Sequence, residues 1–112
     1  MKYTTAAEAV RLIQSHSSVY IQGSTSIPET LVRAMADRAG ELTDVKVYSA
    51  FAVGAFDAPY CQPENRESFL VNSLFVANNI RRWLAEGYGQ TIPAFLGEIP
   101  AMFRDGTLPV DV

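Results

Sequence analysis

The sequence predicts an α/β fold with an open, mainly parallel sheet made of strand–helix–strand units. Two short runs rich in β-branched and aromatic residues, at 19–21 and 45–48, flank a segment with helical periodicity. Such a spacing is typical of a right-handed crossover between parallel strands. The chain has 112 residues, of which 48% are hydrophobic and 19% charged, so it can build one hydrophobic core but not two domains.

The first helix is predicted over residues 5–15. Thr5 and Glu8 have the spacing of a capping box, in which each side chain binds the other residue's backbone N–H. The run at 19–21 then ends at Gly23, which predicts a short buried strand followed by a turn.

A second helix is predicted after this turn. Ser26 and Glu29 again have capping-box spacing, and Pro28 suits a first helical turn. Gly40 is expected to end this helix. Its apolar stripe is expected to consist of Leu31, Met35 and Ala39.

The second half of the chain alternates in the same way. We expect an irregular loop at 51–66, a strand at 69–73, a helix at 78–85, an extended segment at 90–93, two helical pieces within 95–105 separated at Pro100, and a strand at 108–112. Because an apolar strand is an unusual place for a domain to stop, we expect residues 1–112 to be an incomplete N-terminal domain.

Composition and charge exclude several classes of protein. The formal net charge is −3 and the basic residues are scattered, which argues against a nucleic-acid partner. No apolar stretch approaches the roughly 20 residues of a membrane span, and no secretion signal is visible, so we expect a cytoplasmic protein. The single cysteine, Cys61, and the single histidine, His16, make no metal-ligand set.

The first candidate binding segment is the turn between the first strand and the second helix. In parallel sheets ligands bind at the carboxyl ends of strands, where free backbone N–H groups and the helix dipole favour an anion. The candidate residues are Gly23, Ser24, Thr25, Ser26 and Pro28. From spacing alone, a well-capped turn without a ligand explains this segment equally well.

The second candidate segment has the same arrangement of strand end, polar turn and helix start. Its residues are Ser73, Asn79, which could cap the helix, and Arg81, which could bind a carboxylate or phosphate. The spacing slightly favours the alternative in which Arg81 pairs with Glu86 or with solvent.

From residue 19 onward the chain resembles the N-terminal part of the acetyl-CoA hydrolase/transferase family, which includes 4-hydroxybutyrate and succinate:acetate CoA-transferases. The stretches that carry the resemblance are 23–31, 42–45, Ser73-x-Phe75 through Asn79-x-Arg81, Glu86-Gly87, the run Ile92-Pro93-Ala94-Phe95-Leu96-Gly97-Glu98-Ile99-Pro100, Phe103-Arg104 and 106–112. Their order and spacing together are specific to this family.

The resemblance implies two related α/β halves with the active site between them. In such enzymes a glutamate attacks the acyl-CoA thioester, and a glutamyl-CoA intermediate forms. This intermediate then transfers CoA to a carboxylate or, in hydrolases, is hydrolysed by water. That glutamate lies in the C-terminal half of the family, and none of the seven glutamates here matches it. The resemblance therefore implies that this chain holds no catalytic residue and that coenzyme A takes part as a substrate, with no other cofactor. It also implies that the candidate residues of both turns lie near the substrate.

Three functions stay open at this point. We expect an N-terminal part of a CoA-transferase or acyl-CoA hydrolase, which takes acyl-CoA and a small carboxylate, needs the C-terminal half of the same protein and forms a homo-oligomer. The alternatives are a stand-alone α/β module that binds a small anion, and a non-catalytic interaction domain that pairs through an exposed sheet edge.

Overall fold

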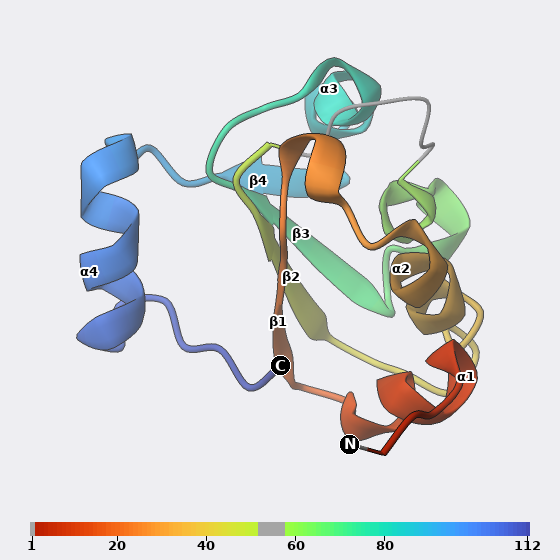
Figure 1. Cartoon of the computed structure of the whole chain (residues 1–112). Helices are drawn as coiled ribbons and strands as arrows, with labels where there is room; N and C mark the ends of the chain where they lie inside the picture. The colour runs from red at the N-terminus through yellow and green to blue at the C-terminus, as the bar shows by residue number, and fades with distance from the viewer. Residues whose placement is uncertain (1, 52–57) are drawn as a thin grey trace.

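The computed structural model describes residues 2–51 and 58–112, and its centre is a four-stranded sheet. The strands are β1 (Ser18–Ile21), β2 (Val45–Ser49), β3 (Phe69–Ser73) and β4 (Gly89–Thr91). They lie in the order β1-β2-β3-β4, and every neighbouring pair is parallel (Figure 1). This confirms the predicted α/β fold with a parallel sheet.

Short helices connect the strands. The α-helices are α1 (Ala6–Ala9), α2 (Glu29–Ala36), α3 (Asn78–Ala85) and α4 (Ile99–Arg104), and the 3₁₀ turns are η1 (Val10–Leu12), η2 (Ser24–Ser26), η3 (Pro59–Cys61), η4 (Pro63–Asn65) and η5 (Leu96–Glu98). In Figure 1, α1 and α2 lie on one side of the sheet and α4 lies on the other. None of the helices in the described part of the chain is long and apolar enough to cross a membrane.

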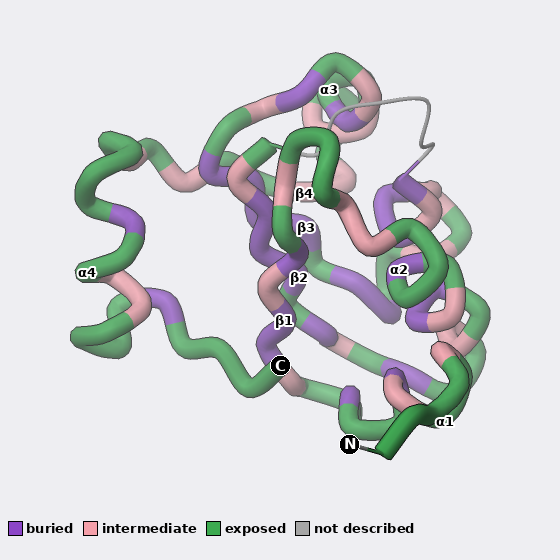
Figure 2. The backbone as a smooth tube through the Cα atoms, viewed as in Figure 1, coloured by how far each residue is buried: buried purple, intermediate pink, exposed green. Residues whose placement is uncertain are grey.

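Both faces of the sheet are covered, as parallel strands require. The larger core joins alternate strand residues to η1, α2 and α3, for example Val47 and Val71 with Met35 and Ile80. A smaller core on the other face includes Tyr48, Leu74, Ile99 and Leu108 and holds α4 against the sheet. Figure 2 shows the buried residues along the strands and the inner surfaces of the helices.

The first helix keeps its predicted start but is shorter than expected. The capping box is confirmed: the Glu8 N–H donates to Thr5 Oγ1 at 3.2 Å, and the Thr5 N–H donates to the Glu8 carboxylate at 3.1 Å. The helix tightens into η1 after Ala9, and Ile13 is already extended, so the expected span 5–15 was too long.

The predicted start of the second helix was wrong. Ser26 belongs to η2, and the residue at the N-cap of α2 is Pro28, which has no side-chain oxygen to cap the helix. The helix also ends at Ala36, and a series of turns carries the chain past Gly40. Of the expected stripe, Met35 is buried and Ala39 packs against the core, but Leu31 is 41% exposed. Val32 and Ala36 are the other buried residues of the helix.

The last elements agree with the sequence in part. The strand at 69–73 and the helix at 78–85 have their predicted bounds. Two helical pieces do occur within 95–105, but Pro100 lies in the first turn of α4, where its missing N–H costs nothing, rather than between the pieces. Residues 108–112 do not form the predicted strand, although Val112 hydrogen-bonds to β1.

The predicted irregular loop at 51–66 is described only in part. Its second half contains η3 and η4, and its residues 52–57 lie outside the described part of the chain.

Candidate functional site

The loops that follow the strands meet at the carboxyl edge of the sheet. Because the strands are parallel, every one of them delivers its following loop to this edge. The loops enclose an open crevice of about 390 Å³, lined by Gly23, Ser24, Ala50, Phe51, Phe75 and Leu96. The lining residues thus come from four separate connections, which is the usual construction of a ligand site in an open α/β sheet.

A tight backbone contact joins the loops after β1 and β2. The Ser24 N–H donates to the Phe51 carbonyl at 2.5 Å. A Cβ atom on Gly23 would lie 2.7 Å from the Phe51 carbonyl oxygen and 2.9 Å from its nitrogen, so a side chain does not fit there. Ser24 has a φ of 57°, a left-handed conformation that costs a non-glycine residue about 1 kcal/mol. The contact with Phe51 holds that conformation in place.

The crevice is mainly apolar. Phe51 is 43% exposed, Phe75 36% and Leu96 69%, although large apolar side chains on a free surface are costly. Among the described lining residues none carries a charge, and the hydroxyl of Ser24 is the polar side-chain group. Such a lining suits an uncharged, partly aliphatic ligand portion better than a phosphate or a carboxylate.

The first predicted binding segment is divided by the structure. Gly23 and Ser24 line the crevice, whereas Thr25 and Ser26 are exposed on η2 and are not among its lining residues. Pro28 is half-buried and lines a different groove, between η1 and α2. The turn therefore supplies two of its five predicted residues to this site.

In the second predicted segment, the polar side chains do not line the crevice, but the turn of the backbone places Phe75 in its wall. Ser73 is fully buried, and its hydroxyl donates to the Phe75 carbonyl at 2.8 Å, which fixes the turn that presents Phe75. Asn79 does not cap α3, because the N-cap position belongs to Ala77 and Asn79 lies inside the first turn. Arg81 is exposed on α3, and it is Arg82 that pairs with Glu86, at 3.2 Å.

Sequence reasoning did not identify the apolar residues that line the candidate crevice. Phe51, Phe75 and Leu96 each follow a predicted strand or extended segment within a few residues. A large apolar residue in a loop at the carboxyl edge is a usable signal, because that edge would otherwise favour polar residues.

A buried tyrosine, Tyr60, lies in η3. It is 1% exposed and interacts with the side chain of Ser49, which is fully buried at the end of β2. Burial, reinforced by the neighbouring Cys61, raises the pKa of the Tyr60 hydroxyl, while the Ser49 side chain opposes this rise only in part. Burial therefore favours the neutral form of Tyr60 in the folded chain.

This burial predicts an alkaline loss of stability. An unfolded tyrosine ionises near pH 10, so the folded chain keeps its full stability below about pH 10 and loses up to about 1.4 kcal/mol per pH unit above it. Urea unfolding at pH 9 to 11 should show this slope, and Tyr60→Phe should flatten it. A Tyr88→Phe variant, which changes a half-buried tyrosine, is the control. Equal slopes in all three chains would contradict the assignment.

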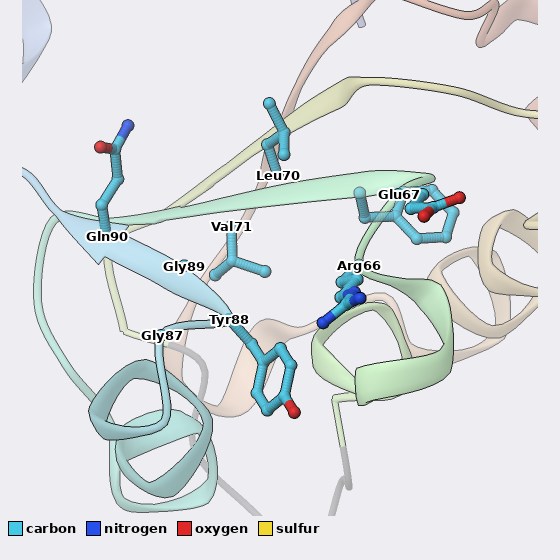
Figure 3. A pocket seen from close by; sticks show the side chains of 9 residues that line it. Arg66, Glu67, Leu70, Val71, Gly87, Tyr88, Gly89 and Gln90 are labelled. Carbon is cyan, nitrogen blue, oxygen red and sulfur yellow. The ribbon is translucent and has the colours of Figure 1, made fainter.

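A larger hollow lies at the other end of the sheet. It measures about 450 Å³ and is formed where β4 begins later than β3, with Val71 paired to Gly89. Figure 3 shows Arg66 and Tyr88 on the same side of β3, with Leu70 pointing away from them. Since this hollow is at the amino ends of the strands, it is not where an open α/β sheet places its ligand.

Acidic groups do not gather at the crevice. All seven glutamates lie in the described part of the chain, and none of them lines it. One glutamate, Glu98, lines a separate hollow of about 350 Å³ together with Leu74, Pro93, Ala94 and Phe95. Within residues 2–51 and 58–112 no group of three or more potential metal ligands occurs.

A parallel α/β sheet with a crevice at its carboxyl edge is the arrangement in which proteins of the open-sheet class usually bind their ligands. The whole chain, residues 1–112, matches the model of the acetyl-CoA hydrolase/transferase N-terminal domain. The chain belongs to this family, as the resemblance in its loops predicted.

Three curated relatives agree with this assignment. The chain is 30% identical over 111 residues to 4-hydroxybutyrate coenzyme A transferase of Clostridium kluyveri, which covers 99% of this chain and 25% of the relative. It is 27% identical over 107 residues to succinyl-CoA:acetate/propanoyl-CoA:succinate CoA transferase of Fasciola hepatica, covering 94% and 22%. It is 25% identical over 111 residues to butyryl-CoA:acetate CoA-transferase of Anaerostipes caccae, covering 99% and 25%. The chain thus spans about a quarter of these relatives' length.

Solved structures show the same fold. RipA from Yersinia pestis superposes with a TM-score of 0.83 at 24% identity, covering 92% of this chain and 26% of that chain. The E249D mutant of RipA superposes with a TM-score of 0.86 at 24% identity, covering 96% and 27%.

Proposed function

We propose that this chain forms the N-terminal part of an enzyme that transfers CoA between an acyl-CoA and a small carboxylate, or hydrolyses the acyl-CoA. In this proposal the chain supplies one wall of the substrate cleft, takes coenzyme A as a substrate and needs no other cofactor. The observation that carries the proposal is the crevice at the carboxyl edge, because it lies in a domain of the acetyl-CoA hydrolase/transferase family. The curated relatives are all CoA transferases.

The proposed reaction is covalent catalysis by a carboxylate. A glutamate outside this chain attacks the thioester carbonyl, and the C–S bond breaks to give an acyl-glutamyl anhydride and the CoA thiolate. The thiolate attacks the glutamyl carbonyl of the anhydride, which releases the acyl group as a carboxylate and leaves a glutamyl-CoA thioester. An incoming carboxylate repeats these steps in reverse to form the new acyl-CoA, whereas water hydrolyses the intermediate.

The role of this chain follows from the lining of the crevice. Phe51, Phe75 and Leu96 would exclude water and contact the aliphatic part of the thioester substrate. The Ser24 hydroxyl is exposed at the same place and could donate to the thioester oxygen, where negative charge develops during attack. No glutamate is in position to act as the nucleophile at this crevice, so that group is assigned to polypeptide that complements this wall.

A titration of the isotopically labelled chain with butyryl-CoA tests this proposal. We expect the amide signals of Ser24, Phe51, Phe75 and Leu96 to shift together, and Phe75→Ala to weaken binding about ten-fold, equivalent to about 1.4 kcal/mol of lost contact. Phe95→Ala is the matched control, because Phe95 is 79% exposed and does not line this crevice. Shifts confined to other surfaces, or equal losses in both variants, would contradict the proposed site.

A further inference from the structure

The hollow at the amino ends of β3 and β4 exists because β4 begins late. Val71 pairs with Gly89, the first residue of β4, so Phe69 and Leu70 at the start of β3 have no strand of the sheet beside them on that side. The space that remains measures about 450 Å³. Gly87 and Gly89 line it without side chains, so nothing from the start of β4 fills it.

The residues around the start of β4 are held in place by close packing. A Cβ atom on Gly89 would lie 2.7 Å from the Leu84 side chain and 2.9 Å from the Val71 carbonyl oxygen, so β4 lies directly against α3 and β3. The ring of Tyr88 lines the hollow and contacts the Trp83 ring edge-on, with centroids 6.2 Å apart. The position of Tyr88 is therefore set before any ligand binds.

The backbone of Phe69 has unpaired groups that face this side of β3. The Val45 N–H donates to the Ser68 carbonyl, and the Ile92 N–H donates to the Ser73 carbonyl. Backbone groups alternate between the two sides of a strand, so Phe69, like Ser73, directs its N–H and carbonyl away from β2. The register leaves both groups without a strand partner, and no other hydrogen bond to them occurs within residues 2–51 and 58–112. Phe69 is 1% exposed, and unpaired backbone groups of buried residues are rare.

Arg66 supplies a positive charge on the wall of the same hollow. It is exposed, and its guanidinium makes no ion pair or hydrogen bond within the described part of the chain. Figure 3 shows this guanidinium directed toward Tyr88, whereas the carboxylate of Glu67, which also lines the hollow, lies away from Tyr88 at the start of β3. A free guanidinium and an unpaired N–H are donors that suit a carboxylate, because each carboxylate oxygen can accept one of them.

We propose that this hollow binds a small carboxylate with an aromatic body. The carboxylate accepts from Arg66 and from the Phe69 N–H, and the aromatic ring packs against Tyr88 and the apolar side chain of Val71. A compact anion such as phosphate leaves these apolar surfaces uncovered. Open parallel sheets place their substrate at the carboxyl edge, so this hollow takes a second ligand that does not compete at the crevice. The proposal does not depend on the proposed CoA chemistry.

A titration with benzoate tests the site. Benzoate is added to the isotopically labelled chain, and the amide spectrum is followed. We expect the signals of Phe69, Tyr88 and Gly89 to shift together, with the Phe69 signal moving downfield because its N–H gains an acceptor. The signals of Ser24 and Phe75 at the crevice should stay unchanged.

Two arginine variants test the role of charge. Arg66→Gln should weaken benzoate binding about five-fold, near the upper limit for an exposed ion pair. Arg81→Gln is the matched control, because Arg81 is also exposed but lies on α3 and does not line the hollow. Both side chains are on the surface, so both variants should fold and Arg81→Gln should bind benzoate as the unchanged chain does.

Three related compounds test the chemical class of the ligand. Benzyl alcohol keeps the ring without the carboxylate, and acetate keeps the carboxylate without the ring, so each should bind more weakly than benzoate. Tighter binding of benzylamine than of benzoate would assign the recognition of charge to Glu67 and overturn the proposal. An unchanged Phe69 signal, or equal losses in Arg66→Gln and Arg81→Gln, would overturn it as well.

Discussion

Replacing Gly23 with alanine is expected to destabilise the chain by about 3 kcal/mol. The added methyl group would lie 2.7 Å from the Phe51 carbonyl oxygen and 2.9 Å from the Phe51 nitrogen, and backbone atoms cannot move aside as a flexible side chain can. Relief of this clash must separate the loops after β1 and β2, which also breaks the bond from Ser24 to Phe51. Urea unfolding measures the loss, and the labelled amide spectrum reports the movement at Ser24 and Phe51.

A matched glycine distinguishes this clash from a general effect of alanine. A Cβ atom on Gly97 would meet no atom within 4 Å, so Gly97→Ala should change stability by less than about 0.5 kcal/mol. If Gly23→Ala were as stable as Gly97→Ala, the close backbone contact between the loops after β1 and β2 would be contradicted. The account of how this contact shapes the crevice would then be wrong.

The second large effect is expected from Phe69→Ala. Phe69 begins β3, is 1% exposed and belongs to the larger core, so its truncation should cost about 3 to 5 kcal/mol. Leu70, the next residue in the strand, points to the opposite face and is 41% exposed, and Leu70→Ala should cost less than about 1 kcal/mol. Urea unfolding of both variants gives the comparison. A smaller loss for Phe69→Ala than for Leu70→Ala would reverse the assigned faces of β3.

The sheet was predictable because local patterns and long-range packing agree in it. The runs at 45–48 and 69–73 are rich in residues that suit a strand buried on both faces, and they became β2 and β3. The second helix was predicted less well, because the spacing of Ser26 and Glu29 imitates a capping box. The chain instead forms η2 there, since the backbone bond of Ser24 to Phe51 redirects it.

The position of the candidate crevice could be predicted from the sequence, but most of the residues that line it could not. The carboxyl edge follows from the parallel topology, and Gly23 and Ser24 were identified from their place after the first strand. Phe51, Phe75 and Leu96 are far apart in sequence, and only the folded sheet brings them together. In the second turn, Ser73 was predicted to bind a ligand, but its hydroxyl donates to the Phe75 carbonyl and stabilises the loop.

The assignment of the nucleophile to polypeptide outside this chain is tested most directly by an activity assay on the purified chain of residues 1–112. The chain is incubated with butyryl-CoA and acetate, acetyl-CoA and free thiol are measured, and the intact mass is determined after borohydride or hydroxylamine treatment. We predict no product above the rate in buffer and no modified glutamate. Turnover that Glu98→Gln abolishes would show that the chain carries its own nucleophile and would contradict the account.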